Sequence, residues 1–225
     1  MPKLRSGFFV TTAWVGFLLI LWAESRALCV HVGLPSDCHA AGPWEVYTDI
    51  NSLVEKGVVI AWLSNLQNVD EFYGSTGKIR ATCIVSSMLF VGPVFSLVGE
   101  IPGLQTSLNS FELRASLPTV VYSLALISCL AGFVYQRVRI KRVYGAATLG
   151  TYLTIRLALI VFYASFALLL SRDYLIHLHH LYVGYLLACM AYDDSFVSLI
   201  FLVVGAGIMV QGIGAYNYAP IVDAS

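Results

Sequence analysis

Long apolar runs separated by short polar segments make up most of this chain. Six of the runs approach the roughly 20 residues that an α-helix needs to cross the hydrocarbon core of a bilayer. The pattern therefore predicts an all-α fold, a polytopic integral membrane helical bundle with six transmembrane helices. The predicted spans are residues 8–23, 81–98, 117–135, 146–170, 174–192 and 195–213.

A further segment, residues 57–73, is apolar only over its first half. Residues 58–63 are apolar, but Asn65, Asp70 and Glu71 follow closely. Its apolar positions keep roughly helical spacing, which favours an amphipathic helix at the membrane surface over a crossing. The bundle has seven spans instead of six if this segment crosses.

Composition agrees with the pattern. Hydrophobic residues make up 58% of the chain, charged residues 12%, and the mean hydropathy is +0.78. A soluble domain carries about twice that charged fraction. The 13 basic and 13 acidic residues leave a net charge of zero, so nothing points to nucleic acid as a partner. The expected location is a membrane, and no pattern names an organelle.

The runs divide the chain into five segments. Lys3 and Arg5 precede the first run, and the small residues at Ala23, Ser25 and Ala27 permit cleavage after it. The first segment is therefore an anchor or a signal peptide, and we expect a retained anchor. The segments are 1–27, the N-terminal transmembrane anchor; 28–78, an extramembrane loop with an amphipathic or short membrane helix; 79–136, two transmembrane helices; 137–145, a basic loop; and 146–225, a tightly connected three-helix membrane unit.

Basic residues give conflicting indications of orientation. The cluster within residues 137–142 and the pair Lys3 and Arg5 are both expected on the inner side of the membrane. The first span then places residues 29–56 outside. An odd number of crossings must separate these residues from the inner cluster, yet only two firm spans lie between them. The conflict disappears if residues 57–73 cross the membrane or if the N-terminus lies outside.

Three histidines stand at the head of the predicted helix 174–192. His177 and His180 share a helical face, with Asp173 one turn earlier. Imidazole and carboxylate are zinc ligands, so these three residues form a candidate metal site with zinc as its ion. Histidines at a helix end also serve as a structural rim that hydrogen-bonds to partner helices or headgroups, and we favour the rim. Bis-histidine haem is disfavoured, because it needs histidines on facing helices.

The same stripe continues into small residues. Gly184 and Ala188 follow His177 and His180 on one face, and small residues let helix backbones approach closely in lipid. We therefore expect His177 and His180 to face the helix bundle and His179 to face headgroups or a partner.

Arg156 lies near the middle of the predicted span 146–170. An arginine at mid-membrane costs about 3 kcal/mol on insertion scales and needs a partner. Asp193 and Asp194 cap the neighbouring helix on the same side, so we expect a structural ion pair with Arg156. The alternative is an ion or proton path.

Cys29 and Cys38 bracket eight residues of a predicted loop. A disulfide closing this loop is the favoured interpretation, provided that the loop faces an oxidising compartment. Free thiols remain an alternative, as does a metal site that adds His31 and His39.

The C-terminal residues carry a weak resemblance. "IHLHHLYVGYLLACM" followed by "GAGIMVQGIGAYNYAPIVD" is similar to the last helix pair of uncharacterised eukaryotic multi-pass membrane proteins of the LCCL-domain-associated type. The resemblance covers about 45 residues. It implies a multi-pass helical architecture and gives no activity, and the LCCL domain itself has no counterpart in this chain.

Abundant packing residues and few intramembrane charges predict a non-catalytic protein. We expect an accessory or scaffold subunit whose partners are the lipid bilayer and other membrane subunits. The first alternative is a small transporter or channel that uses Arg156 with Asp193 and Asp194. The second is a metal-binding membrane protein that uses the outer histidines. The sequence contains no nucleophile-elbow, zinc-protease, P-loop or dinucleotide-binding motif.

Overall fold

The computed structural model describes residues 2–36, 38–66, 77–100, 117–170, 174–176, 180–218 and 222–224. Over these residues the protein is predominantly helical, and one short two-stranded ribbon is the only other regular element, which confirms the predicted helical class. Within the described ranges, three helical stretches are long and apolar enough to cross a membrane, namely Gly7–Val32, Ser123–Ser165 and Phe196–Tyr216. The helices are α1 (Pro2–Ala27), the π-helical turn η1 (Leu28–Val32), α2 (Pro43–Leu63), α4 (Gly77–Gly99), α5 (Leu117–Leu170), α6 (His180–Cys189) and α7 (Phe196–Tyr216), and the strands are β1 (Tyr174–Ile176) and β2 (Val222–Ala224).

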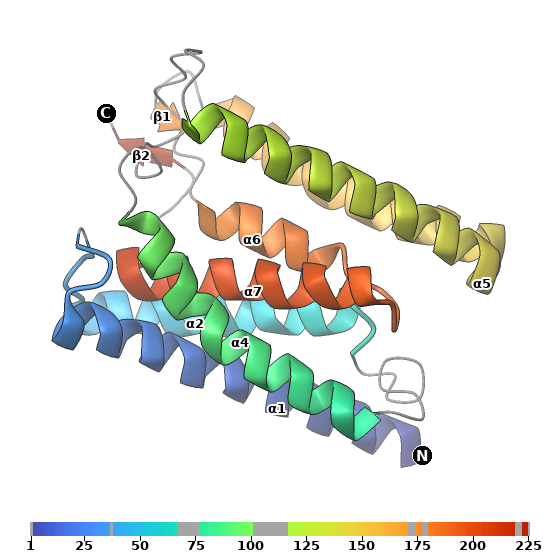
Figure 1. Cartoon of the computed structure of the whole chain (residues 1–225), viewed down its shortest axis with the longest axis horizontal. Helices are drawn as coiled ribbons and strands as arrows, with labels where there is room; N and C mark the ends of the chain where they lie inside the picture. The colour runs from blue at the N-terminus through green and yellow to red at the C-terminus, as the bar shows by residue number, and fades with distance from the viewer. Residues whose placement is uncertain are drawn as a thin grey trace. The chain divides into compact units, whose positions relative to one another are not determined.

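The chain forms two compact units, which we describe separately. Residues 1–101 and 179–219 make the first unit, and residues 102–178 and 220–225 make the second. In the first unit α7 is the central helix, packed against α6, α4 and α1 (Figure 1). Helix α2 lies along α1 and also contacts α6 and α7.

Neighbouring helices of the first unit alternate in direction. On α2, Asp49 bonds to Arg26 near the end of α1, whereas Gly57 lies against Leu18 further back, so these two helices are antiparallel. Helix α6 is antiparallel to α7, because Gly184 lies against Met209 whereas the later Ala188 lies against the earlier Gly205. Helices α1 and α4 run parallel to α7, since their late residues Ser25 and Ser96 lie beside the late α7 residues Gly214 and Gln211. The first unit is therefore an up-and-down bundle in which the ends of α1, α4 and α7 share one end with the starts of α2 and α6.

Glycines allow α7 to occupy the centre of this bundle. A Cβ placed on Gly205 would meet backbone atoms of Ala188 and Gly184 on α6. A Cβ on Gly207 would meet the side chain of Val91 on α4, and a Cβ on Gly214 would lie 2.6 Å from the Ser25 Cβ on α1. Each of these glycines thus allows one neighbouring helix to pack closely against α7: α6 at Gly205, α4 at Gly207 and α1 at Gly214. The predicted packing face of Gly184 and Ala188 is confirmed.

Helix α7 begins in a local hydrogen-bond network. The Ser195 side chain caps the helix by accepting from the Ser198 amide at 3.1 Å. Asp193 Oδ1 in turn accepts from the Ser195 amide at 3.1 Å and from its hydroxyl at 2.7 Å. This network satisfies amides that an uncapped helix start leaves without partners.

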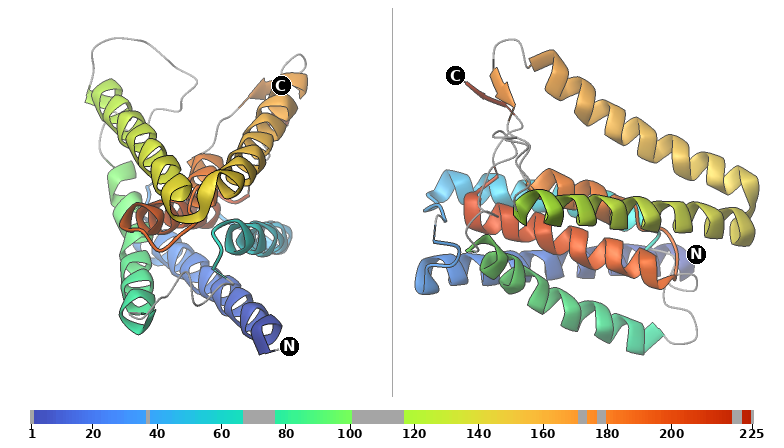
Figure 2. Two further views of the ribbon diagram at one scale, coloured as in Figure 1. Left: turned by 90° about the vertical axis from the view of Figure 1, so that its right-hand side faces the viewer. Right: turned by 45° about the horizontal axis from the view of Figure 1, so that its top comes forward.

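In the second unit α5 is a hairpin of two helical arms. Gly145 interrupts the helix with φ 89° and ψ 175°, and Figure 2 shows the chain reversing there. A positive φ of this kind is readily adopted only by glycine. Phe133 and Tyr152 stack across the hairpin with ring centroids 6.4 Å apart, and the Arg156 guanidinium lies 4.2 Å over the Tyr152 ring.

Several predicted boundaries need correction. The helix predicted over 174–192 is wrong at its start, because residues 174–176 pair with 222–224 as antiparallel strands and the helix spans only His180–Cys189. The predicted basic loop 137–145 is helical up to Tyr144. A short apolar run fits a strand as well as a helix, and charged residues do not stop a helix when residues 137–144 contain neither proline nor glycine.

Two predicted segments are divided differently in the structure. Residues 57–63 are the last part of α2, which begins 14 residues earlier at Pro43, and residues 67–73 lie outside the described residues. Of the predicted three-helix unit, 146–170 belongs to the second unit, whereas α6 and α7 belong to the first.

Candidate functional site: a buried charge cluster

A cluster of charged and aromatic side chains lies inside the first unit, toward the end where α1 and α7 finish. We call it the charge cluster. Helices α1 and α2 supply its charges, while α6 and the residues after α7 supply tyrosines. Its members are Trp22, Arg26, Asp49, Ser52, Lys56, Tyr182, Tyr185 and Tyr218.

Asp49 is completely buried and accepts three hydrogen bonds. Its Oδ2 atom accepts from Trp22 Nε1 at 3.1 Å and from Arg26 Nη2 at 3.0 Å. Its Oδ1 atom accepts from the Tyr218 amide at 2.6 Å. Three donors, one of them charged, offset the desolvation of the carboxylate, so Asp49 joins α1, α2 and the segment after α7.

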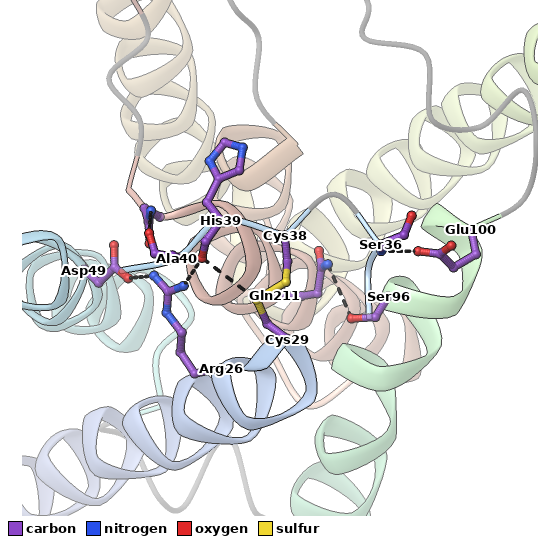
Figure 3. The surroundings of a disulfide bond; sticks show 11 residues. Arg26, Cys29, Ser36, Cys38, His39, Ala40, Asp49, Ser96, Glu100 and Gln211 are labelled. Carbon is purple, nitrogen blue, oxygen red and sulfur yellow. Dashed lines mark hydrogen bonds and ion pairs between the residues drawn. A yellow bond between two sulfur atoms is a disulfide. The ribbon is translucent and has the colours of Figure 1, made fainter. Parts of the chain in front are cut away.

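Arg26 joins the same helices to the disulfide loop, residues 29–40, which contains the bond between Cys29 and Cys38. Figure 3 shows its guanidinium between the Asp49 carboxylate and the His39 carbonyl, to which Nη1 donates at 2.8 Å. The Nε atom of Arg26 is buried and has no hydrogen-bond partner among the described residues. The cluster therefore retains unused donor capacity.

Lys56 is also buried, with 4% of its surface exposed. Its side chain follows the Cα–Cβ direction toward the start of α2, and Nζ donates to Ser52 Oγ one turn earlier at 2.9 Å. The ammonium lies 4.6 Å from the ring centroid of Tyr218 and 6.0 Å from those of Tyr182 and Tyr185. Among the residues that the structure describes, Lys56 has no ion-pair partner.

The energies of these contacts leave Lys56 incompletely compensated. Burial of an ammonium costs several kcal/mol. A desolvated cation–π contact contributes about 2 kcal/mol at close range, and two of the three rings here lie near the ~6 Å limit. The hydrogen bond to Ser52 uses one of the three ammonium protons. Two cations and one carboxylate thus give the described cluster an excess positive charge.

A disulfide closes the loop above the cluster, as predicted. Cys29 and Cys38 are bonded, with their Cα atoms 5.8 Å apart (Figure 3), so they are neither free thiols nor metal ligands here. The loop also holds the end of α7, because the His39 amide donates to the Ala215 carbonyl at 2.8 Å and Asn217 Nδ2 donates to the Ala40 carbonyl at 3.2 Å.

Two further contacts fix α4 at this end of the bundle. Glu100 accepts a hydrogen bond from the Ser36 amide in the disulfide loop. Gln211 of α7 donates to Ser96 of α4 at 3.5 Å, and both side chains are buried (Figure 3). All five helices of the first unit are therefore connected by polar contacts or tight packing near the cluster.

The predicted metal site falls largely outside the described residues. Asp173 and His177 lie in segments that are not described, and only the backbone of His180 is described, at the start of α6. Within the described ranges, no group of three or more His, Cys, Asp or Glu side chains is arranged to hold a metal ion. The zinc site stays a prediction.

The predicted ion pair of Arg156 also stays a prediction. Arg156 is buried in the second unit, whereas Asp193 and Asp194 belong to the first. Asp193 has a local role that the sequence interpretation missed, because it supports the Ser195 cap of α7.

The charge cluster itself was missed at the sequence level. Asp49, Ser52 and Lys56 have the i, i+3, i+7 spacing of one helical face, which is a readable signal. The pattern over residues 28–78 predicts mainly an extramembrane loop, in which such spacing does not indicate a buried face. The contribution of Tyr218 is 169 residues away from Asp49 in sequence and leaves no local pattern.

Comparison with known proteins adds no relative: no family model, curated protein or solved structure matches this chain.

Proposed function

We propose that this chain is a non-catalytic integral membrane protein that crosses the bilayer seven times and acts as an accessory or scaffold subunit of a larger membrane complex. The outward face of α2 is the observation that carries the subunit role. Trp44, Tyr47, Val54, Val58 and Trp62 are exposed along it, and Glu55 is exposed among them.

The position of Glu55 makes this face unsuited to lipid. Glu55 lies 12 residues from the start of α2, about 18 Å along the helix. A carboxylate at that depth costs too much free energy to face hydrocarbon, and in membrane helices such residues face another protein element or water. The apolar residues around it match a partner helix, so a second membrane protein covering α2 accounts for both features.

Seven crossings also remove the orientation conflict. At about 1.5 Å per residue, the 21 residues of α2 extend about 31 Å, which is enough to cross the hydrocarbon core. The order α1, α2, α4, two arms of α5, α6 and α7 then gives seven crossings, of which α6 is the shortest. The four basic residues of the α5 turn and Lys3, Arg5, Lys78 and Arg80 all fall on one side.

The disulfide supports the same orientation independently. Cys29 and Cys38 follow the end of α1, so the disulfide lies at the opposite end of that helix from Pro2. Disulfides persist in oxidising compartments, so that end faces the lumen, periplasm or exterior, while the basic side faces the cytosol. The bilayer and at least one further membrane subunit are the partners in this proposal.

Cysteine labelling tests the crossings. In a chain with Cys83, Cys129 and Cys189 replaced by alanine, Trp44→Cys should react with a membrane-impermeant maleimide on sealed cells. Asn65→Cys and Val143→Cys should react only after permeabilisation. Labelling of Trp44→Cys and Asn65→Cys from the same side would overturn the seven-crossing topology, because residues 43–63 would then not cross.

Native gel electrophoresis in mild detergent tests the subunit role. The wild-type chain should migrate in a complex well above its own mass, and Glu55→Gln should weaken that complex about fivefold, since polar contacts between membrane helices contribute on the order of 1 kcal/mol. Glu45→Gln, with the same change near the helix start, is the matched control. Migration of the wild type as a monomer would contradict the subunit role and favour the transporter or channel alternative.

A further inference from the structure

We propose that Lys56 and the tyrosines around it form a binding site for a small monovalent anion, such as a halide or a short carboxylate. The proposal goes beyond the subunit role and does not depend on the number of crossings. It is based on the charge of the described cluster, which contains two cationic side chains, Arg26 and Lys56, and one carboxylate, Asp49.

The Asp49 carboxylate is engaged by groups other than Lys56. Its two oxygens already accept from Trp22, Arg26 and the Tyr218 amide. No salt bridge joins Asp49 to Lys56 among the described residues. The ammonium therefore needs its negative charge from a group that is not part of the described chain.

The groups around the ammonium suit a small anion. Lys56 has two protons beyond the one that it donates to Ser52. The Tyr182 hydroxyl donates to the Tyr218 hydroxyl at 3.4 Å, which leaves the Tyr218 proton for a further acceptor. Rings of Tyr182, Tyr185 and Tyr218 surround the same point and exclude large or highly hydrated ligands.

The depth of the ammonium sets the size of the ligand. Because Nζ lies beside Ser52, it stands about 13 Å from the start of α2 and roughly one turn below Asp49. The disulfide loop and the segment after α7 lie over the same end, as shown by the bonds from Asn217 to Ala40 and from Tyr218 to Asp49. Enclosure by the tyrosines and by these segments favours a monatomic or two-carbon anion over a phospholipid headgroup.

Thermal unfolding of the full chain in lipid nanodiscs tests the proposal. Chloride, bromide, formate or acetate replaces the bulky anion gluconate at constant ionic strength. For the wild type, the unfolding midpoint should rise with the logarithm of the concentration of at least one of these anions, because a ligand that binds only the folded state stabilises it. In Lys56→Met this dependence should disappear, and in the control Lys141→Met, an exposed lysine on α5, it should persist.

Tyr218→Phe provides a second test that keeps the charge in place. It should leave the midpoint in gluconate nearly unchanged and weaken the apparent affinity for the effective anion about tenfold, the loss expected for one hydrogen bond to a charged group. The proposal is overturned if none of the four anions shifts the wild-type midpoint. It is also overturned if Tyr218→Phe and, where it folds, Lys56→Met respond as the wild type does.

Discussion

Helix α7 and the arms of α5 are both candidate membrane-spanning helices, but they differ in their surroundings. Both are apolar enough to cross a bilayer, but 67% of the apolar window of α7 is buried within the protein, against 17% for α5. On α7 the buried residues include Gly205, Gly207, Gly212 and Gly214, whereas α5 exposes large aliphatic side chains such as Leu124, Leu130 and Leu157. Hydropathy thus identifies a membrane helix, and side-chain size identifies the one at the centre of a bundle.

The glycines of the two helices differ in the same way. A Cβ on Gly205, Gly207 or Gly214 of α7 would collide with a neighbouring helix, while a Cβ on Gly150 of α5 would meet nothing within 4 Å. The glycines of α7 are therefore required by contact between helices. On α5 only Gly145 has a conformational requirement, at the turn.

The comparison predicts its largest effect at Gly205. Gly205→Leu should destabilise the first unit by more than about 3 kcal/mol, because the new side chain meets backbone atoms of Ala188 and Gly184 that cannot move aside. Gly150→Leu on α5 should change stability by less than about 1 kcal/mol. Reversible unfolding in mixed micelles, followed by circular dichroism, measures both, and equal losses would break the comparison.

A smaller loss is expected at Asp49. Asp49→Asn should cost about 3 kcal/mol, because it leaves the largely enclosed guanidinium of Arg26 without its carboxylate partner. Lys141→Ala, a charge change on the exposed surface of α5, should lie within about 0.5 kcal/mol of wild type. Chemical unfolding of the two variants side by side measures the difference. An Asp49 variant as stable as the Lys141 variant would show that the charges of the first unit are not coupled to its folding.

The smallest effect is expected at the start of α7. Ser195→Ala should cost about 1 kcal/mol, because it removes the cap to the Ser198 amide and the bond to Asp193. On α5, Thr151→Ala removes only a hydroxyl that bonds to the Ala147 carbonyl of its own helix, at 3.3 Å. Its cost should stay below about 0.5 kcal/mol. Hydrogen exchange of the first-turn amides of α7 should report fraying in the first variant alone.

Much of the helical framework was predictable, because a membrane helix is recognisable from the length of a single apolar run. Apolar length predicted residues 117–135, 146–170 and 195–213 as helical, and the spacing of Cys29 and Cys38 predicted the disulfide. Helix α2 was harder to recognise, because its buried charges lower its hydropathy. Asp49 is paired with Arg26 of α1, and Lys56 lies among the rings of Tyr182 and Tyr218. These charges therefore weaken the local signal without preventing burial.

What the sequence concealed was mostly non-local. Residues 174–176 are apolar and adjoin a helix, yet they pair with residues 222–224 nearly 50 positions later. No spacing in the sequence predicts that the Tyr218 amide donates to Asp49. Such contacts depend on which helices become neighbours, and a pattern confined to one helix carries no information about that.

The bond between Asp49 and Tyr218 has a consequence for biosynthesis. The carboxylate enters the nascent hairpin of α1 and α2 early, whereas the Tyr218 amide is made 169 residues later. At a translation rate of roughly 5–20 residues per second, this donor follows about 10–30 s after its acceptor. During that interval the hairpin holds a partly satisfied acidic group, and chains that stop before Tyr218 retain it permanently. Synthesis of the segment after α7 is thus the step that completes the hydrogen bonding of Asp49, in the earliest-made part of the bundle.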